Sequence, residues 1–172
     1  MAAHVTPIDF VAIDFETANE RRDSACAVAI AIVRGGEIET RSWLLRPPDM
    51  RFSPFNIRVH GITPAMVQRA PTWGEAWPEI APVLAAAPEL WAHNAPFDAG
   101  VLRAVCAMHG LVAPWPLRCT VQLARRHWPG LHCHKLDVVC AHLGIGLRHH
   151  DAVSDARACA RIVLAARGLP AW

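Results

Sequence analysis

The 172-residue sequence predicts an α/β protein whose mixed sheet is flanked by helices. Residues 8–45 read as strands in a meander, and helical patterns alternate with short strands after residue 64. A Gly35-Gly36 pair separates two long apolar runs, which is a strong hairpin signal. Strands that first meander and then alternate with helices are typical of a sheet that starts with three antiparallel strands and continues with parallel ones.

The composition favours a single domain over residues 1–172, with a core at about 8–167. A hydrophobic share of 53% with 19% charged residues excludes a disordered chain. No apolar run approaches the roughly 20 residues of a membrane span, and residues 1–6 lack the regions of a signal peptide. We therefore expect a cytoplasmic protein without a membrane partner, whose six cysteines are reduced and mostly buried.

The first elements follow from apolar alternation. Residues 8–15 predict a central strand covered on both sides, because both alternating sets are apolar: Ile8, Phe10 and Ala12 on one face, and Val11, Ile13 and Phe15 on the other. Ala25–Val33 and Glu37–Leu45 predict the hairpin. A loop through Phe52, Phe55 and Asn56 then leads to His60.

The later elements follow from caps and helical periodicity. Thr63 and Pro64 predict a short helix to about Gln68. A helix is predicted at Glu75–Ala87, where Pro78 and Pro82 leave its start and straightness open. The remaining predictions are strands at 89–92 and 117–120, and helices from Asp98 to about Gly110, from a Thr120 cap to Arg126, at Lys135–Leu143, and from Ala152 to Ala166 before Gly168 and Pro170.

Four carboxylates occupy unusual positions in this scheme. Asp14 and Glu16 stand two residues apart at the end of the first strand, so both project to one face. Asp98 heads the apolar stripe of Val101, Leu102 and Val105, and Asp155 heads that of Cys159, Ile162 and Ala166. Each acid alone has an ordinary alternative, a solvated turn after a strand or a partner for a helix dipole.

Together the four acids predict a cation site, because unpaired buried carboxylates are costly. An all-oxygen ligand set suits Mg²⁺ or Mn²⁺, and a two-ion site fits displacement at phosphorus. The attacking water needs a general base, and His150, five residues before Asp155, is the candidate. His149 is its rival, although we expect it to be a surface histidine.

These residues resemble a known family. Asp14-Phe15-Glu16-Thr17, His93-Asn94-Ala95-Pro96-Phe97-Asp98 and His150-x-x-x-x-Asp155 are similar to the three motifs of the DEDDh 3′–5′ exonucleases, a group that includes the DNA polymerase III epsilon-subunit-like and ribonuclease T-like enzymes. The resemblance implies a ribonuclease H-like fold and two divalent ions. It implies Asp14, Glu16, Asp98 and Asp155 as metal ligands and His150 as base.

The resemblance also implies substrate contacts. The substrate would be a single-stranded or frayed 3′ end of DNA or RNA, and the product a nucleoside monophosphate. His60-Gly61-Ile62-Thr63 is similar to the family element that contacts terminal nucleotides, with Ile62 as a wedge between bases. The implied substrate-binding residues are Phe15, Thr17, His60, Ile62, Asn94 and Phe97. For Phe15 and Phe97 the alternative is core packing.

The chain departs from the family pattern at two places and carries an uneven charge. Ala18-Asn19 replaces the commoner Thr-Gly, and Pro96 stands where small polar residues are frequent. Residues 111–150 hold five arginines and lysines but one acid, which predicts a surface for a phosphate backbone. The alternative is an ordinary solvated face. The His132, Cys133, His134, Cys140 and His142 cluster matches no common zinc module, and its role is open.

Two other functions remain open from the sequence. A non-catalytic nucleic-acid-binding or polymerase-associated module is disfavoured by the intact acids, whose mutual repulsion such a module does not need. A hydrolase of short oligonucleotides or dinucleotides would share the chemistry but not need an extended basic groove. Association with a polymerase or as a homodimer, and the choice between DNA and RNA, are open.

Overall fold

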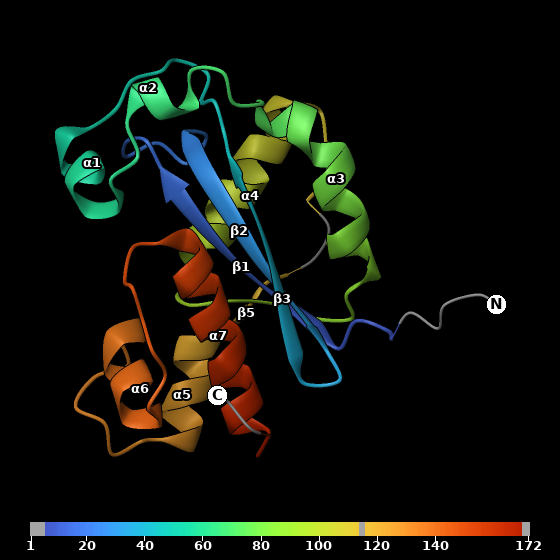
Figure 1. Cartoon of the computed structure of the whole chain (residues 1–172), viewed down its shortest axis with the longest axis vertical. Helices are drawn as coiled ribbons and strands as arrows, with labels where there is room; N and C mark the ends of the chain where they lie inside the picture. Colours follow the sequence, from blue (N-terminus) through green and yellow to red (C-terminus); the bar gives the residue numbers. More distant parts are fainter. Residues whose placement is uncertain (1–5, 114–115, 170–172) are drawn as a thin grey trace.

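The computed structural model describes residues 6–113 and 116–169, so the expectations for the first residues and for Pro170 lie outside the described residues. Its elements, in chain order, are β1 (Phe10–Thr17), β2 (Ala25–Arg34), β3 (Glu37–Leu44), α1 (Pro54–His60), α2 (Pro64–Val67), α3 (Trp73–Ala86), β4 (Leu90–Ala92), α4 (Pro96–Met108), β5 (Arg118–Cys119), α5 (Thr120–His127), α6 (Leu136–Leu143) and α7 (Ala152–Ala166) (Figure 1). Over these residues no helix has the length and apolar character needed to cross a membrane.

The strands form one sheet in the order β3-β2-β1-β4-β5. β1 pairs antiparallel with β2, and β2 antiparallel with β3. β1 pairs parallel with β4, and β4 parallel with β5. The predicted antiparallel start and parallel continuation are therefore confirmed. Because β1 is central and parallel to β4 and β5, the carboxyl ends of these three strands meet at one edge of the sheet.

Helices cover both faces of the sheet, as the two apolar sets of the first strand predicted. α7 lies against the face that carries Phe10 and Ala12 (Figure 1). Small side chains line this contact on both sides, including Ala29 and Ala31 of β2 and Ala160 of α7, and they allow the helix to approach the strands closely. α3 and α4 cover the other face, where Val11, Ile13, Leu84 and Leu102 are among the buried residues.

Ile8 does not lie on the face predicted for it. It precedes β1, and it packs with Val11 and Ile13 instead of with Phe10 and Ala12. The alternation of β1 does not extend to Ile8, which precedes the strand, although the Asp9 N–H still donates to the Val33 carbonyl of β2 at 2.8 Å.

The predicted loop through Phe55 and Asn56 is wrong, because these residues form α1. Ser53 caps this helix by accepting a hydrogen bond from the Phe55 N–H at 3.2 Å. Pro54 occupies its first position, and Gly61 ends it in the left-handed conformation. None of the residues of α1 is fully buried, so the apolar periodicity that reveals longer helices is absent.

Three helix starts refine the prediction. α3 begins at Trp73, two residues early, and continues through Pro78 and Pro82. Thr63 is the N-cap residue of α2 but its side chain makes no capping hydrogen bond. Thr120 is the first residue of α5, not its cap: its hydroxyl lies 3.4 Å from the Ala92 carbonyl and so ties α5 to the sheet.

The two threonine caps generate a test of the fold. Thr72 forms a complete capping box with Glu75, whereas Thr63 forms none. We expect Thr72→Ala to lower the free energy of unfolding by about 1 kcal/mol, and Thr63→Ala to lower it by less than about 0.5 kcal/mol. Urea unfolding of both variants measures this. Equal losses would contradict the assigned caps.

Candidate active site

A cavity of about 600 Å³ opens where the carboxyl ends of β1 and β4 meet the first turns of α4 and α7. All five residues predicted as catalytic line it: Asp14, Glu16, Asp98, His150 and Asp155. Among the residues predicted to bind substrate, Phe15, Thr17, His60, Asn94 and Phe97 also line it. Ile62 is not among the lining residues. The structure therefore brings together side chains that lie as far apart in the chain as Asp14 and Asp155.

Backbone hydrogen bonds hold two of the acids from neighbouring segments. The Phe15 N–H of β1 donates to Asp98 Oδ1 of α4 at 3.1 Å. The His150 N–H donates to Asp155 Oδ2 of α7 at 3.1 Å. Each carboxylate also stands in the first turn of its helix, where the helix dipole favours negative charge. Both acids are buried, so their orientation is fixed by the fold.

The cavity strongly disfavours four simultaneous negative charges. Burial, followed by Asp98 and Glu16, raises the pKa of Asp14 well above its ordinary value. Burial, followed by Asp155 and Asp98, raises the pKa of Glu16 to about 8. Burial raises the pKa of Asp98 to about 7, and that of Asp155 to about 6, against the opposing effect of the backbone hydrogen bonds. Without a cation, these acids are partly protonated at neutral pH.

The donor set fits divalent cations. Asp155 Oδ1 is buried and has no hydrogen-bond partner among the described residues. Carboxylate oxygens are the ligands that Mg²⁺ and Mn²⁺ prefer, and a cation would remove the repulsion that raises these pKa values. A tight group of three potential ligands in the described chain is His149, His150 and Asp155, whose ligand atoms lie within 4.8 Å of one another.

His149 and His150 form a stacked pair at the mouth of the cavity. Their ring centroids lie 3.9 Å apart, with 13° between the planes. His149 Nε2 is 4.0 Å from Asp155 Oδ2, whereas His150 contacts the same oxygen through its backbone. Burial and then His149 lower the pKa of His150, so its ring is neutral and able to accept a proton near pH 7. His150 has φ = 66°, a left-handed conformation that is uncommon for a residue with a side chain.

α1 is held at the end of β1 by hydrogen bonds to the carbonyl of Thr17. Asn56 Nδ2 donates to this carbonyl at 2.8 Å, and His60 Nε2 lies 3.2 Å from it. The Ile62 N–H donates to His60 Nδ1 at 3.0 Å, so Nδ1 is the acceptor and Nε2 carries the proton. The pair of contacts makes α1 one wall of the cavity, a role that the sequence did not reveal.

The role of Ile62 as a wedge between bases stays a prediction, and its side chain does not line the cavity. Ile62 is only 8% exposed and packs with Ala18, Cys26 and Val67 beneath α1. Phe55 of α1 instead lines the cavity with 65% of its surface exposed. An exposed aromatic ring at a cavity rim is a candidate stacking surface for a base. The Ser53-Pro54 start and the Gly61 end of α1 are the signals that could have placed Phe55 on a helix.

The two motif phenylalanines differ in their surroundings. Phe15 is 3% exposed, and its ring packs against Trp73 at a centroid distance of 5.6 Å, so it belongs to the core beneath the cavity. Phe97 is half-buried, and the Arg22 guanidinium lies 4.3 Å from its ring centroid. Arg22 Nη1 also donates to the Phe97 carbonyl at 3.2 Å. Arg22 therefore fixes the first turn of α4 from a loop 75 residues away.

Both departures from the family pattern have structural roles. Pro96 is the first residue of α4, where its missing N–H has no helical partner to lose. Asn19 is buried, and its side chain donates to the Arg51 carbonyl at 2.6 Å and accepts from the Arg21 N–H at 2.9 Å. Asn94, just before α4, is exposed at the cavity with φ = 64°, a conformation that asparagine tolerates.

His93 joins the sheet to α5. Its Nδ1 lies 2.9 Å from the Thr120 hydroxyl, and burial lowers the pKa of the imidazole to about 4. A neutral His93 therefore holds the start of α5 beside β4. This contact positions Arg125 of the same helix at the cavity.

The histidine and cysteine cluster is split between the cavity and the core. Cys133 and His134 line the cavity beside Lys135. Cys140 is buried in the core cluster beneath α7. His134 Nε2 lies 3.0 Å from the Trp128 carbonyl. All six cysteines are free thiols, and four of them are buried.

The chain matches the RNase_T family model, described as exonuclease, over residues 11–163. It is 33% identical over 159 residues to the PolC-type DNA polymerase III of Clostridium perfringens (strain 13 / Type A), covering 90% of this chain but 11% of that protein. It is 30% identical over 165 residues to exodeoxyribonuclease 10 of Escherichia coli (strain K12), covering 93% of this chain and 69% of that protein.

Solved structures share the fold. Exonuclease X in complex with 5′ overhanging duplex DNA has a TM-score of 0.75 and 28% identity, with 95% of this chain and 93% of that chain covered. The nuclease domain of 3′hExo, a DEDDh family member bound to rAMP, has a TM-score of 0.78 and 21% identity, with 93% and 91% covered. The predicted ribonuclease H-like fold is confirmed. The resemblance to DEDDh exonucleases is also confirmed, and the chain belongs to the RNase_T exonuclease family.

Proposed function

We propose that this chain is a single exonuclease domain that releases nucleoside monophosphates from single-stranded or frayed 3′ ends by a two-metal-ion mechanism. The observation that supports it most is the convergence of Asp14, Glu16, Asp98 and Asp155 with His150 on one cavity. Four carboxylates whose pKa values are raised by burial and by one another form a site that needs cations.

The four carboxylates would hold two Mg²⁺ or Mn²⁺ ions. When bound, such ions activate a water and stabilise the leaving oxygen at phosphorus. The neutral His150 imidazole takes the proton from the attacking water. The protonated imidazole is then stabilised by Asp155, whose negative charge already opposes the fall in the pKa of His150. His149 stacks on His150 and restricts its ring.

The wall formed by α1 would receive the terminal nucleoside. Phe55 and Phe97 offer aromatic surfaces to a base or sugar, and Arg22 fixes the position of Phe97. Thr17 of β1 and Asn94, just before α4, supply polar atoms to the same cavity, and His60 holds α1 in place because both of its ring nitrogens are already hydrogen-bonded. The opposite wall carries Arg125 and Lys135, which suits phosphates. Aromatic stacking accepts every base, so this wall would bind ends of any sequence.

The partners and location of the chain are also proposals. The chain spans 11–12% of the PolC-type polymerases that it matches, which supports work beside a polymerase. The name of the relative exodeoxyribonuclease 10 favours DNA as the substrate of this chain. The structural neighbour bound to rAMP keeps RNA as an alternative substrate. A homodimer and a cytoplasmic location stay predictions. A non-catalytic binding module and a dinucleotide hydrolase are the alternatives that the first experiment separates.

That experiment compares wild type with Asp14→Asn on matched 5′-labelled DNA and RNA oligonucleotides and on a dinucleotide, each with Mg²⁺ or Mn²⁺. We expect a ladder that shortens from the 3′ end with wild type, and background cleavage with the variant, because the substitution removes one anionic ligand. Cleavage of the dinucleotide alone would favour the small-substrate hydrolase. Binding without cleavage would favour the non-catalytic module.

The raised pKa values predict how stability depends on pH and metal. Glu16 and Asp98 have folded pKa values of about 8 and 7, above their ordinary values near 4, so the folded state binds more protons than the unfolded state between these limits. The free energy of unfolding of the metal-free protein should therefore fall from pH 5 to pH 8. We expect Mg²⁺ to restore it at pH 8, because the ion binds the folded state.

Urea unfolding at four pH values, with EDTA or with Mg²⁺, measures this dependence. Glu16→Gln should flatten the pH profile and raise the stability of the metal-free protein at pH 8 by about 1–2 kcal/mol, because it removes one repelling charge. Glu39→Gln, on the exposed face of β3, is the control and should leave the profile unchanged. A wild-type profile that rises with pH would contradict the assigned repulsion.

The two stacked histidines can be separated by substitution. We expect His150→Ala to lower turnover about 100-fold or more while metal binding persists, because the attacking water loses its base. His149→Ala should lower turnover less than about 10-fold, since this ring only restricts its neighbour. Single-turnover rates and Mn²⁺ titration followed by its paramagnetic signal measure both properties. The reverse order of the two losses would assign the base to His149.

A further inference from the structure

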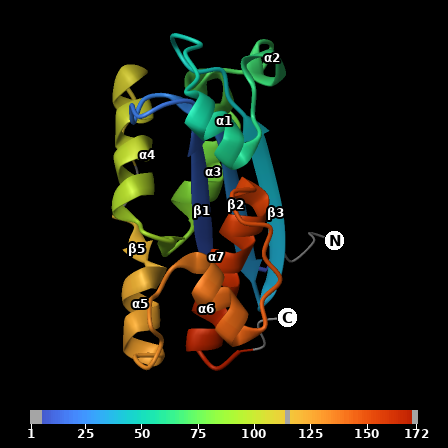
Figure 2. The same ribbon diagram turned by 90° about the vertical axis from the view of Figure 1, so that its left-hand side faces the viewer.

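A second cavity, of about 620 Å³, lies along the β5 edge of the sheet, where α4 and α5 lie above and below β5 (Figure 2). Three of its lining residues are arginines from three different elements: Arg103 of α4, Arg118 of β5 and Arg126 of α5. Among the described residues, no aspartate or glutamate lines it. Cations contributed from three sides, without a lining acid from the described chain, make this cavity attractive to anions.

Two of these arginines have uncompensated charge. Arg118 Nη1 lies 3.5 Å from Glu89 Oε1, and its guanidinium stands over Trp91. Arg103 and Arg126 are exposed, and neither has an ion-pair partner within the described part of the chain. The planar guanidinium group of each remains available for a bidentate contact to a phosphate.

This arginine cavity adjoins the catalytic cavity. In the segment that opens α4, Asn94 and Phe97 line the catalytic cavity, whereas Ala95 and Pro96 line the arginine cavity. In α5 the same division occurs between Arg125 and Arg126, and between Val121 and Gln122. The residues that open α4 and the first two turns of α5 therefore separate the two cavities. A nucleic-acid strand that left the catalytic cavity between α4 and α5 would meet Arg126 on the other side of α5.

The charges on the walls of the catalytic cavity indicate on which side the upstream nucleic-acid strand would leave it. Its α1 wall carries Phe55, Asn56 and a His60 whose pKa is lowered by burial, so these lining residues bring no full positive charge at neutral pH. The facing wall carries Arg125 and Lys135. A terminal nucleoside adds no phosphate beyond the scissile one, whereas the upstream strand adds one phosphate per nucleotide. The upstream strand therefore matches the α5 side.

We propose that the arginine cavity binds upstream phosphates of the nucleic-acid substrate, with Arg103 and Arg126 as the contacting residues. The inference rests on the proposed function and deepens it: it makes the substrate a strand of several nucleotides and not a dinucleotide. The occupant is the single-stranded segment immediately upstream of the scissile bond. Its phosphates bind the arginines. The strand passes from the catalytic cavity to the arginine cavity over Gln122 and the backbone of Pro96.

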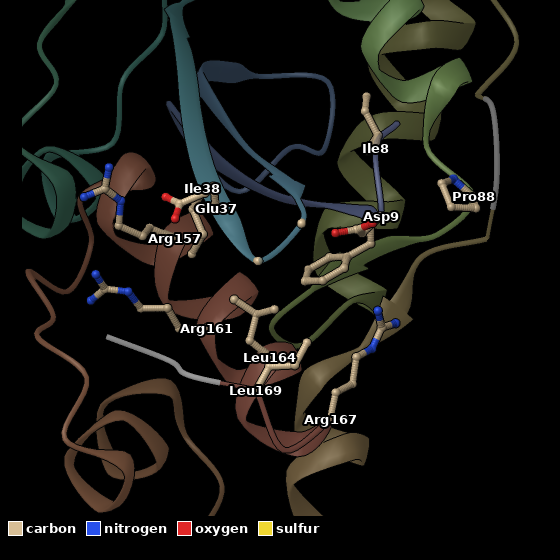
Figure 3. Close-up of a pocket in the computed structure, with 13 residues that line it drawn as sticks. Ile8, Asp9, Glu37, Ile38, Pro88, Arg157, Arg161, Leu164, Arg167 and Leu169 are labelled. Carbon is tan, nitrogen blue, oxygen red and sulfur yellow. The ribbon is translucent and has the colours of Figure 1, made fainter. Parts of the chain in front are cut away.

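A larger cavity supplies the control. About 920 Å³ in volume, it is lined by Asp9, which directly precedes β1 (Figure 3). Asp14 and Glu16 lie toward the other end of that strand. Arg157 and Arg161 of α7 line it, the first exposed and the second half-buried, but Asp9 and Glu37 line it too (Figure 3). Arg157→Gln/Arg161→Gln thus removes the same charge from two positions of α7 that line this cavity and neither the catalytic cavity nor the arginine cavity.

The experiment compares wild type, Arg103→Gln/Arg126→Gln and Arg157→Gln/Arg161→Gln. Binding of 5′-labelled single strands of about 2, 4, 8 and 12 nucleotides is measured in Ca²⁺ between about 25 and 200 mM salt, and kcat/KM is measured in Mg²⁺. For the longest strand we expect the Arg103/Arg126 variant to raise Kd roughly tenfold and to lower the salt slope by about 1.4, at about 0.7 per lost phosphate contact. For the dinucleotide, kcat/KM should change less than about twofold.

Each possible result either supports or overturns the proposed role of the arginine cavity. A length-dependent loss confined to the Arg103/Arg126 variant supports the proposal. An equal loss on the dinucleotide, an equal loss in the Arg157/Arg161 variant, or no loss at any length would overturn it. Wild type that binds the longest strand through these arginines but cleaves nothing would uphold the arginine cavity and reject the proposed function. Wild type that neither binds nor cleaves would overturn both.

Discussion

The mutual repulsion of four buried or half-buried carboxylates is the constraint on which the site depends. Asp14 and Glu16 are carried by the central strand, and Asp98 and Asp155 by the first turns of two helices that cover opposite faces of the sheet. No short segment could supply all four, so the acids meet only when both layers have packed. Folding thus concentrates negative charge in a place where water screens it poorly, which makes cation binding favourable.

The stability that offsets this repulsion comes from contacts away from the cavity. α7 packs against β1 and β2 through alanines and through buried Phe10 and Val163. On the other face, a larger cluster joins α3 and α4 to the sheet. Because Asp98 and Asp155 stand where their helices begin, these core contacts extend along the helices away from the acids. In both α4 and α7, the acidic residue of the site therefore lies at the start of the helix, and the apolar core contacts lie further along it.

The features that could be predicted from the sequence are those that apolar periodicity and helix capping determine. The strand order of the meander, the face shared by Asp14 and Glu16, and the buried heads of α4 and α7 all follow from repeating apolar positions. α1 was missed because its seven residues bury no full side chain, and the burial of Ile62 was not predicted because it depends on packing against β2 and α2. The contact of Arg22 with Phe97 joins distant segments and leaves no local signal.

The two walls of the catalytic cavity differ in chemical character. α1 presents an exposed phenylalanine and neutral polar groups, and α5 and the segment before α6 present cations. Phosphate contacts carry no sequence information, and aromatic stacking accepts any base. An enzyme that shortens a strand one nucleotide at a time must accept each base in turn, so a site that reads only the shape and charge of an end suits repeated cleavage. The hydrogen bonds of Asn56 and His60 to the Thr17 carbonyl fix the position of α1. In the proposed function, that position would set where the end stops relative to the acids.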